Sequence, residues 1–415
     1  MEYIGITLSH PTGNPNVKGV LMGLQENNIL QSFHTSIAYF PCGFIAQIAK
    51  IPLLKDFKRR NFDPTIRKQI HTYPYKELGR LFSQRLNLNG LLLHETGIFS
   101  TDKCCRYIDD KTAGYMLNNK NITGVYAYED SALSQFSVAK KQGIKCFYDL
   151  PIGYWRAKNR MLSEEIEKYP DWKITLGGFN DSPEKLQCKD KELSLADIIF
   201  VASSFTKKTL EEEYPGKLAP IKVIPYGFPP VNDARTFSSS QNRKIKLLYV
   251  GGLTQRKGIA YIFDAVKGLE NNIELTVAGK GNIDGCPALK KELNKHNYIP
   301  SLPHNEVLEL MATQDILVFP SLFEGFGLVI TEAMSQGTPV ITTDRTCAPD
   351  VITHKQDGWI VEAGSVIALR KQLEEIIASP TVLKSVGQAA LQTAKNRPWT
   401  KYGQETAKAI MELYS

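Results

Sequence analysis

Short apolar runs alternate with longer amphipathic stretches along most of this chain of 415 residues. The alternation is typical of βαβ units, in which helices cover both faces of a parallel sheet. In the first half it predicts strands at residues 3–8, 125–128, 144–148, 198–202 and 223–225, and helices at 17–26, 75–86, 132–142, 156–168 and 206–213.

The rhythm stops after Pro229 and Pro230, where Ser, Asn and Asp follow without periodicity, as in a linker. It resumes near Ile245. There it predicts strands at residues 246–250, 274–278, 316–320 and 339–342, and helices at 259–269, 305–313, 328–335, 365–378 and 402–414. We therefore expect an α/β protein with an N-terminal domain over residues 1–228, a linker over 229–243 and a C-terminal domain over 244–395.

Composition places the chain among soluble globular proteins, with 42% hydrophobic and 22% charged residues. No segment approaches the roughly 18–20 apolar residues of a membrane-spanning helix, and the N-terminus lacks the basic start of a secretory signal. The seven cysteines are scattered and form no C-x-x-C pair, so we expect neither a disulfide framework nor a zinc site. A reducing cytoplasm fits this cysteine usage.

The net charge is +7, and part of it is concentrated in residues 55–68. A solvated basic face is the favoured interpretation of this cluster. The alternative is peripheral contact with an anionic membrane or a phosphorylated acceptor. Aromatic residues do not interleave with the basic ones as in nucleic-acid-binding proteins, so no nucleic-acid partner is expected.

Two glutamates flank a predicted helix start in the segment 319–340. A strand ends near Pro320, Glu324 lies in the following loop, and the helix begins at about Leu328 with Glu332 one turn inside it. The glycines around Phe326 let the backbone approach a ligand closely, and the first N–H groups of a helix favour phosphate. Ionised glutamates only accept hydrogen bonds, which suits the hydroxyls of a sugar and a ribose.

A cationic loop follows an earlier strand, where Gly251 and Gly252 lead to Arg256 and Lys257. Both cations match phosphate oxygens, so they could neutralise a nucleoside-diphosphate leaving group without a metal. No Asp-x-Asp follows a predicted strand, and we expect no metal and no cofactor. Each segment alone also fits an ordinary turn, helix cap or solvent-facing glutamate. Their order along the chain, however, predicts that both lie at one edge of a parallel sheet.

The stretch Glu324-Gly-Phe-Gly-Leu-Val-Ile-Thr-Glu332 resembles the E-x7-E signature of retaining glycosyltransferases of family 4, which have the GT-B fold. The Arg256-Lys257-Gly258 loop, Pro339-Val-Ile-Thr-Thr and Gly358-Trp-Ile-Val continue the resemblance, which covers about residues 245–380. It implies two Rossmann-like domains facing a cleft, with the C-terminal helix, residues 396–415, crossing back to the N-terminal domain. It also implies a nucleotide-sugar donor, such as a UDP- or GDP-sugar, and a glycan, lipid-linked or other hydroxyl acceptor.

The resemblance also implies roles for individual residues. Glu324 would bind the donor sugar near the reacting carbon, Glu332 the ribose, and Arg256 and Lys257 the departing diphosphate. The remaining residues expected to bind the donor are Gly251, Gly252, Gly325, Phe326, Gly327, Leu328 and Gly13.

The sequence departs from the family pattern at two places. Gly252 stands where many members carry an arginine, so Arg256 would be the only guanidinium. No histidine follows the strand at residues 144–148, and Asp149, or Tyr148, is the candidate to replace it as a catalytic residue.

Further N-terminal residues could take part. His10 or Asn14 could meet the acceptor, although a loop histidine without a role is the favoured interpretation of His10. Glu129 and Asp130 could line the cleft, but a cap of the next helix is favoured.

The expected activity is metal-independent transfer of a sugar to a hydroxyl with retention of the anomeric configuration. The departing diphosphate is stabilised electrostatically. Two alternatives remain. One is an enzyme of the same architecture with another chemistry, such as a glycosyl phosphorylase or a sugar-nucleotide epimerase. The other is a non-catalytic sugar-nucleotide-binding subunit.

Overall fold

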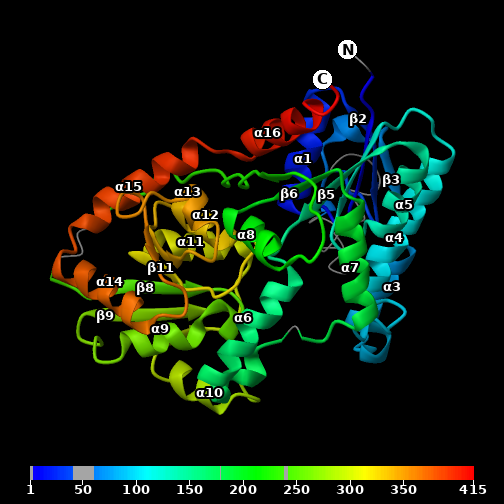
Figure 1. Ribbon diagram of the computed structural model, residues 1–415. Helices are drawn as coiled ribbons and strands as arrows, with labels where there is room; N and C mark the ends of the chain where they lie inside the picture. The colour runs from blue at the N-terminus through cyan, green and yellow to red at the C-terminus, as the bar shows by residue number, and fades with distance from the viewer. Residues whose placement is uncertain (1–2, 41–59, 178, 238–241) are drawn as a thin grey trace.

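Two parallel sheets, each covered by helices, lie side by side in the computed structural model, which describes residues 3–40, 60–177, 179–237 and 242–415 (Figure 1). This arrangement confirms the expected α/β fold class with two Rossmann-like domains. In both sheets the strand order reverses in the middle, between β1 and β4 and between β8 and β11. Ligands of open α/β sheets bind at such reversal points, beyond the carboxyl ends of the strands.

The first sheet has the strand order β3-β2-β1-β4-β5-β6-β7. Its strands are β1 (Ile6–Ser9), β2 (Leu30–Thr35), β3 (Ile70–Thr72), β4 (Gly124–Tyr128), β5 (Lys145–Leu150), β6 (Ile198–Val201) and β7 (Ile221–Val223). The helices of this half are α1 (Pro15–Glu26), α3 (Tyr75–Arg85), α4 (Thr101–Leu117), α5 (Leu133–Gln142), α6 (Trp155–Lys168), α7 (Pro183–Leu195) and α8 (Ser204–Glu213), with the 3-10 turns η2 (Pro64–Ile66), η3 (Asn89–Leu92) and η4 (Pro170–Thr175).

The second sheet has the strand order β10-β9-β8-β11-β12-β13. Its strands are β8 (Ile245–Val250), β9 (Ile273–Ala278), β10 (Asn297–Ile299), β11 (Ile316–Phe319), β12 (Val340–Thr343) and β13 (Trp359–Val361). The helices are α9 (Ile259–Val266), α10 (Pro287–Leu293), α11 (His304–Thr313), α12 (Leu328–Ser335), α13 (Ala348–Val351), α14 (Val366–Ala378), α15 (Val382–Lys395) and α16 (Trp399–Met411), with the 3-10 turn η5 (Gln255–Lys257).

The structure contains strands that the hydrophobic pattern does not predict, among them β2 in the first sheet. This strand is buried although it carries Ser32, His34 and Thr35. The Ser32 hydroxyl bonds to the Thr7 hydroxyl at 3.0 Å, and the His34 ring bonds to the Tyr73 hydroxyl at 3.1 Å. Buried polar side chains are tolerated when they are hydrogen-bonded, so tertiary partners allow a polar sequence to form an inner strand.

The C-terminal helix α16 packs on α1 of the N-terminal half, as expected for this fold, so both chain ends lie at the same side of the molecule (Figure 1). Glycines permit the close approach of the two helices. A Cβ atom on Gly403 would overlap with the carbonyl oxygen of Gly19, and one on Gly23 would overlap with the backbone of Gly403.

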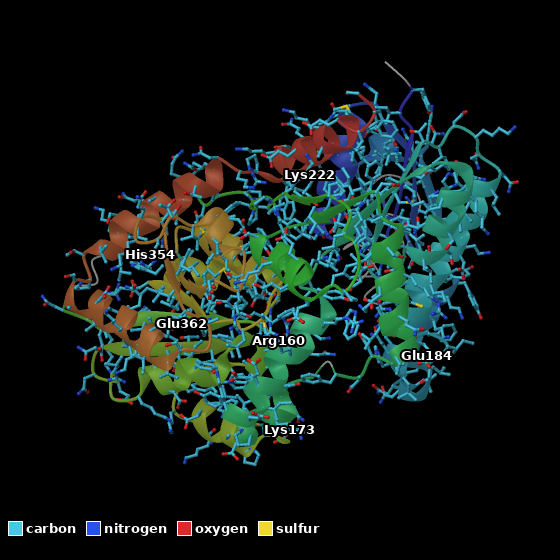
Figure 2. All side chains as sticks on the ribbon, in the orientation of Figure 1. Arg160, Lys173, Glu184, Lys222, His354 and Glu362 are labelled. Atoms are coloured by element: carbon cyan, nitrogen blue, oxygen red, sulfur yellow. The ribbon has the colours of Figure 1, made fainter. Side chains whose placement is uncertain are left out.

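The segment from α6 to η4 was expected within the N-terminal domain, yet its end contacts the C-terminal half. Glu165 accepts hydrogen bonds from the Gln255 amide at 2.6 Å and the Tyr261 hydroxyl at 2.9 Å. Tyr169 donates to Asp264 at 3.0 Å. The start of α6 remains with the N-terminal half, where Arg160 donates to Glu213 of α8 at 2.7 Å (Figure 2). In addition to the linker and α16, the helix α6 therefore joins the two halves by contacting both of them.

The basic cluster is only partly described. Lys55, Lys58 and Arg59 lie outside the described residues. Arg60, which was expected on a basic surface, is instead buried in contact with the carboxylate of Glu77. Among the described residues, no helix has both the length and the apolar character needed to span a bilayer.

We expect Gly403→Ala to lower the free energy of unfolding by about 1–2 kcal/mol. A new methyl group overlapping the α1 backbone costs about 1–3 kcal/mol, more than the gain of up to about 1 kcal/mol from better helix propensity. Gly114→Ala in α4 is the matched control, because a Cβ there meets nothing within 4 Å. Urea denaturation should show Gly114→Ala to be stabilised. If both variants were stabilised alike, the close helix contact would be absent in solution.

Candidate functional site

A cavity of about 550 Å³ lies where the carboxyl ends of β8 and β11 face the loops after β1 and β4. Both halves of the chain contribute to it. The N-terminal half supplies His10, Asn14, Asn16, Tyr128, Glu129, Pro151 and Tyr226, and the C-terminal half supplies Val250, Gly251, Gly252, Lys257, Phe319, Glu324, Phe326, Gly327, Leu328, Val329 and Glu332.

Glu324 and Lys257 line this cavity and Arg256 contacts Glu324, so the structure brings together the three charged residues that the sequence singles out. The Lys257 ammonium contacts the Glu324 carboxylate, and Arg256 Nη1 donates to the same carboxylate oxygen at 3.1 Å. Arg256 also donates to the Phe323 carbonyl at 2.7 Å, which fixes its guanidinium behind Glu324 rather than on the cavity wall. One carboxylate is therefore shared by two positive charges.

The environment of Lys257 makes its charge sensitive to what binds beside it. Burial and the neighbouring Arg256 guanidinium lower the pKa of Lys257 to about 7. The Glu324 carboxylate acts in the opposite direction, because an adjacent negative charge favours the protonated amine. A second anion in the cavity would strengthen that effect.

The start of α12 closes one end of the cavity. Gly327 has a left-handed φ of 90°, and no side chain caps the first N–H groups of the helix. Such groups attract an anion, helped by the helix dipole. Glu332 lines the cavity one turn further on, where burial raises its pKa and His304, 3.8 Å away, acts against that rise.

The Gly251-Gly252 turn provides backbone without side chains beside Lys257. Gly251 has a φ of 148°, and a Cβ atom on Gly279 of the next strand end would overlap with the Gly251 carbonyl. The turns at Gly251 and Gly279 therefore pack directly on each other. The glycines leave open the space that the cavity occupies.

Gly325 was expected to bind the donor, but it does not line the cavity. Its carbonyl accepts hydrogen bonds from the Ser203 hydroxyl at 2.6 Å and the Thr206 hydroxyl at 3.2 Å. A Cβ atom at this position would overlap with the Pro151 carbonyl. The residue next to Glu324 is thus part of the contact between the two halves.

Asp149 lies beneath the cavity wall and does not line it. The carboxylate is buried and accepts a hydrogen bond from the Tyr126 hydroxyl at 2.7 Å. Burial raises the pKa of Asp149 to about 7, against the effect of that hydrogen bond. The hypothesis that Asp149 replaces the family histidine at the donor sugar does not fit this geometry. Gly13, expected at the transferred sugar, lies instead on a neighbouring cavity and packs on Phe62.

Glu129 lines the cavity, although the sequence favoured a helix cap for it. The N-terminus of α5 has no capping side chain of its own. Asp109 of α4 takes that position and accepts hydrogen bonds from the Ser134 and Gln135 amides at 2.8 and 3.0 Å. Glu192 of α7 accepts from the Asp130 and Ala132 amides just before the helix, each at 3.0 Å. Glu129 pairs with Lys189 at 3.1 Å. The side chains that bind the amides at the start of α5 are far from it in the sequence. The local pattern therefore could not reveal that Glu129 is left to face the cleft.

His10, for which no role was favoured, also lies on the wall of the cavity. Its Nδ1 lies at hydrogen-bonding distance, 3.0 Å, from the Thr12 amide nitrogen. Burial lowers the pKa of His10 to about 4, so the ring is neutral at physiological pH.

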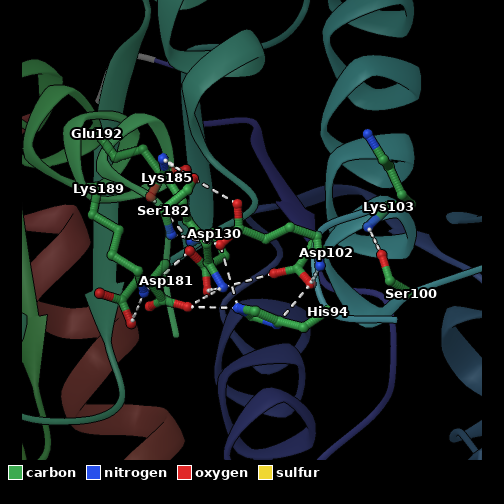
Figure 3. A network of polar contacts seen from close by, with 12 residues as sticks. His94, Ser100, Asp102, Lys103, Asp130, Asp181, Ser182, Lys185, Lys189 and Glu192 are labelled. Atoms are coloured by element: carbon green, nitrogen blue, oxygen red, sulfur yellow. Dashed lines mark hydrogen bonds and ion pairs between the residues drawn. The ribbon is translucent and has the colours of Figure 1, made fainter. Parts of the chain in front are cut away.

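A separate polar cluster joins the first turns of α4 and α7 (Figure 3). Lys185 Nζ lies 2.6 Å from Asp102 and 3.0 Å from Asp181, and His94 Nε2 lies 2.9 Å from Asp181. Within the described part of the chain, His94, Glu95 and Asp181 are the one group whose spacing suits a metal ion. Lys185 lies among these carboxylates and offsets part of their charge, and its ion pairs with Asp102 and Asp181 join the two helices.

Asp149→Asn should raise the free energy of unfolding at pH 8 by about 4 kcal/mol at most and leave it unchanged near pH 4. The folded pKa lies above the unfolded value of 3.8, so the unfolded chain ionises first and wild-type stability falls as the pH rises from about 4 to about 7. Asparagine keeps the acceptor for Tyr126 without the charge. Denaturation curves between pH 4 and 8 test this, with the exposed Asp171→Asn as control. A pH-independent difference would contradict the buried, protonated carboxyl.

Comparisons with known proteins relate part of the chain to a family and the whole chain to a fold. Residues 231–393 match the family model of glycosyl transferases group 1. Glycogen synthase of Mycobacterium tuberculosis H37Rv is 27% identical over 229 residues, which cover 52% of this chain and 54% of that protein. An uncharacterised glycosyltransferase of Methanocaldococcus jannaschii is 33% identical over 138 residues, 31% of this chain and 35% of that protein. The chain thus spans about half, or less, of the length of these relatives.

Solved structures resemble the whole chain. Sucrose-phosphate synthase from Thermosynechococcus elongatus superposes with a TM-score of 0.66 at 16% identity and covers 99% of both chains. Anabaena HepE in complex with UDP and glucose superposes with a TM-score of 0.61 at 14% identity, covering 98% of this chain and 99% of that one. At these sequence identities the similarity shows that the fold is shared and nothing more. Residues 231–393 are thus similar to the glycosyl transferases group 1, and the chain as a whole has the GT-B fold of two Rossmann-like domains.

Proposed function

We propose that this protein is a retaining glycosyltransferase that moves a sugar from a nucleoside-diphosphate sugar to an acceptor hydroxyl without a metal. One observation carries the proposal. Lys257, the uncapped start of α12 and two glutamates line one cavity that both halves of the chain enclose. Cations and helix N–H groups suit a diphosphate, and carboxylates suit the hydroxyls on either side of it.

The donor would lie along the C-terminal wall of the cavity. Glu332 accepts from the ribose hydroxyls, Lys257 and the amides of α12 hold the diphosphate, and Glu324 accepts from the sugar. The UDP complex of HepE, a protein of the same fold, supports a uridine nucleotide as the first candidate.

Catalysis would rest on stabilising the charge that develops on the leaving diphosphate. Lys257 and Arg256 together supply two positive charges beside Glu324, and preorganised charges of this kind contribute most of the rate enhancement at many active sites. The acceptor hydroxyl attacks from the side on which the diphosphate leaves, and a diphosphate oxygen takes its proton. The resemblance to the E-x7-E signature supports retention of configuration.

Location in the cytoplasm and contact with an anionic membrane through residues 55–68 remain part of this proposal. Arg60 does not contribute to such a surface because it is buried against Glu77. Arg67 and Lys68 are exposed and available for it.

Glu324→Gln should lower kcat by about 10²–10³-fold while the nucleotide still binds, because one preorganised electrostatic contact is typically worth that much. A screen of nucleotide sugars by thermal shift first identifies the donor, since a ligand at 100 times its Kd stabilises by about 2.7 kcal/mol. Release of nucleoside diphosphate from the labelled donor then measures turnover. The exposed Glu362→Gln is the matched control (Figure 2).

The alternatives give different outcomes in the same assay. Release of nucleoside diphosphate that requires inorganic phosphate would indicate a phosphorylase. Donor binding without any release by the wild type would indicate a non-catalytic subunit. Near-normal turnover by Glu324→Gln would mean that the reacting sugar lies elsewhere.

Binding of the nucleoside diphosphate at pH 8 should take up to one proton from solution, and the uptake should vanish below about pH 6. In the free protein the pKa of Lys257 is about 7, so the amine is largely neutral at pH 8 and becomes charged when the diphosphate arrives. Calorimetry in buffers of different ionisation enthalpy counts the protons. Lys257→Met should abolish the uptake, whereas the exposed Lys290→Met should not. No uptake by the wild type would show that Glu324 already keeps the amine charged.

A further inference from the structure

The helix α3 turns polar residues inward and apolar residues outward. Glu77 is only 1% exposed and contacts the buried Arg60. In contrast, Tyr75, Phe82 and Leu86 are 58%, 51% and 66% exposed. With 3.6 residues per turn, these three side chains lie within about 40° of one another around the helix. A helix that covers a protein core has the opposite polarity, so the packing of the fold does not account for this outer stripe.

The turn after α3 continues the apolar surface. Residues 75–98 contain seven of the fourteen exposed large apolar side chains in the described part of the chain. The segment folds back on α3, since the Phe99 amide donates to the Leu91 carbonyl at 2.9 Å and a Cβ atom on Gly79 would overlap with the Phe99 ring. Figure 1 shows α3 at the edge of the N-terminal half, on the side away from the second sheet. The seven side chains, which we call the α3–η3 face, are Tyr75, Phe82, Leu86, Leu88, Leu91, Leu93 and Ile98.

Lysines and aromatic rings border the α3–η3 face. The Lys76 ammonium lies 5.4 Å from the ring centre of Tyr75, and the Lys111 ammonium lies 5.4 Å from that of Tyr107. The two tyrosine rings are 6.3 Å apart. Residues 78–93 contain neither Asp nor Glu. The face thus combines apolar side chains with cations whose stems lie along apolar surface.

This combination suits the surface of an anionic bilayer. Leucine and phenylalanine side chains of a surface-bound helix enter the boundary between headgroups and acyl chains, and basic residues bind the anionic headgroups. Tyrosine rings favour the level of the headgroups. Carboxylates would be repelled there, and residues 78–93 offer none. A cluster of exposed apolar side chains marks an interaction site, and its charge favours anionic lipid as the occupant.

We propose that the protein docks on an anionic lipid bilayer through the α3–η3 face, with Leu86, Leu88 and Leu91 inserted among the headgroups. This surface is distinct from the basic residues 55–68, because its binding depends on apolar side chains. The inference goes beyond the proposed function, since docking requires no sugar nucleotide.

The opposite side of α3 lies near the cleft. Arg80, Leu81 and Gln84 are centred about 180° away from the apolar stripe, and they line a cavity of about 350 Å³. Loop residues 12–14 line the same cavity, and Asn14 also lines the cleft. One helix therefore separates the α3–η3 face from the cavity beside the cleft. Under the proposed function, docking would bring the cleft close to an acceptor held in the bilayer.

The test measures sedimentation of the full chain with sucrose-loaded vesicles in the absence of nucleotide. Vesicles of phosphatidylcholine alone are compared with vesicles in which phosphatidylglycerol makes up about a third of the lipid. We expect binding to the mixed vesicles. It should weaken at least tenfold in the triple variant Leu86→Ser, Leu88→Ser and Leu91→Ser, because apolar burial is lost. A matched control, which should bind like the wild type, changes three exposed apolar residues outside the face, namely Leu117→Ser, Ile174→Ser and Ile367→Ser.

A second variant tests the contribution of charge. Lys76→Gln combined with Lys111→Gln should lower the preference for mixed over pure phosphatidylcholine vesicles at least threefold. Failure of the wild type to bind the mixed vesicles would overturn the inference, as would equal losses in the two triple variants. A wild-type dimer in sedimentation equilibrium that the leucine variant dissociates, without vesicle binding, would mean that a second copy covers the face. Vesicle binding by a protein that binds no sugar nucleotide would refute the proposed function and leave the docking surface intact.

Discussion

The site depends on one shared carboxylate. Glu324 contacts both Arg256 and Lys257, so the three groups together carry one surplus positive charge when Lys257 is protonated. The shared carboxylate holds both basic side chains beside the cavity. Under the proposed function, a diphosphate would bind these basic groups while the sugar hydroxyls bind the carboxylate. The partners come from adjacent strands, since Arg256 and Lys257 follow β8 and Glu324 follows β11.

The loop that carries Glu324 also contacts the N-terminal half. Gly325, next to Glu324, is bound through its carbonyl by Ser203 and Thr206 of the N-terminal half. Gln255, next to Arg256, bonds to Glu165 of α6. Residues next to both charged groups therefore also hold the halves together. Under the proposed function, we expect a rotation of one half against the other to move Glu324 or Arg256 and so to affect donor binding.

The sequence predicts apolar strands better than polar ones, for a physical reason. The inner strand β11 is a continuous apolar run, β8 is one except for Lys246, and α12 begins at Leu328, where the glycine pattern places it. The strand β2 is polar and depends on partners such as Thr7 and Tyr73. Local patterns likewise place Glu324 beside Lys257. They cannot show that Asp109 and Glu192 bind the amides at the start of α5 and leave Glu129 to the cleft, because these contacts join residues 25 positions apart or more.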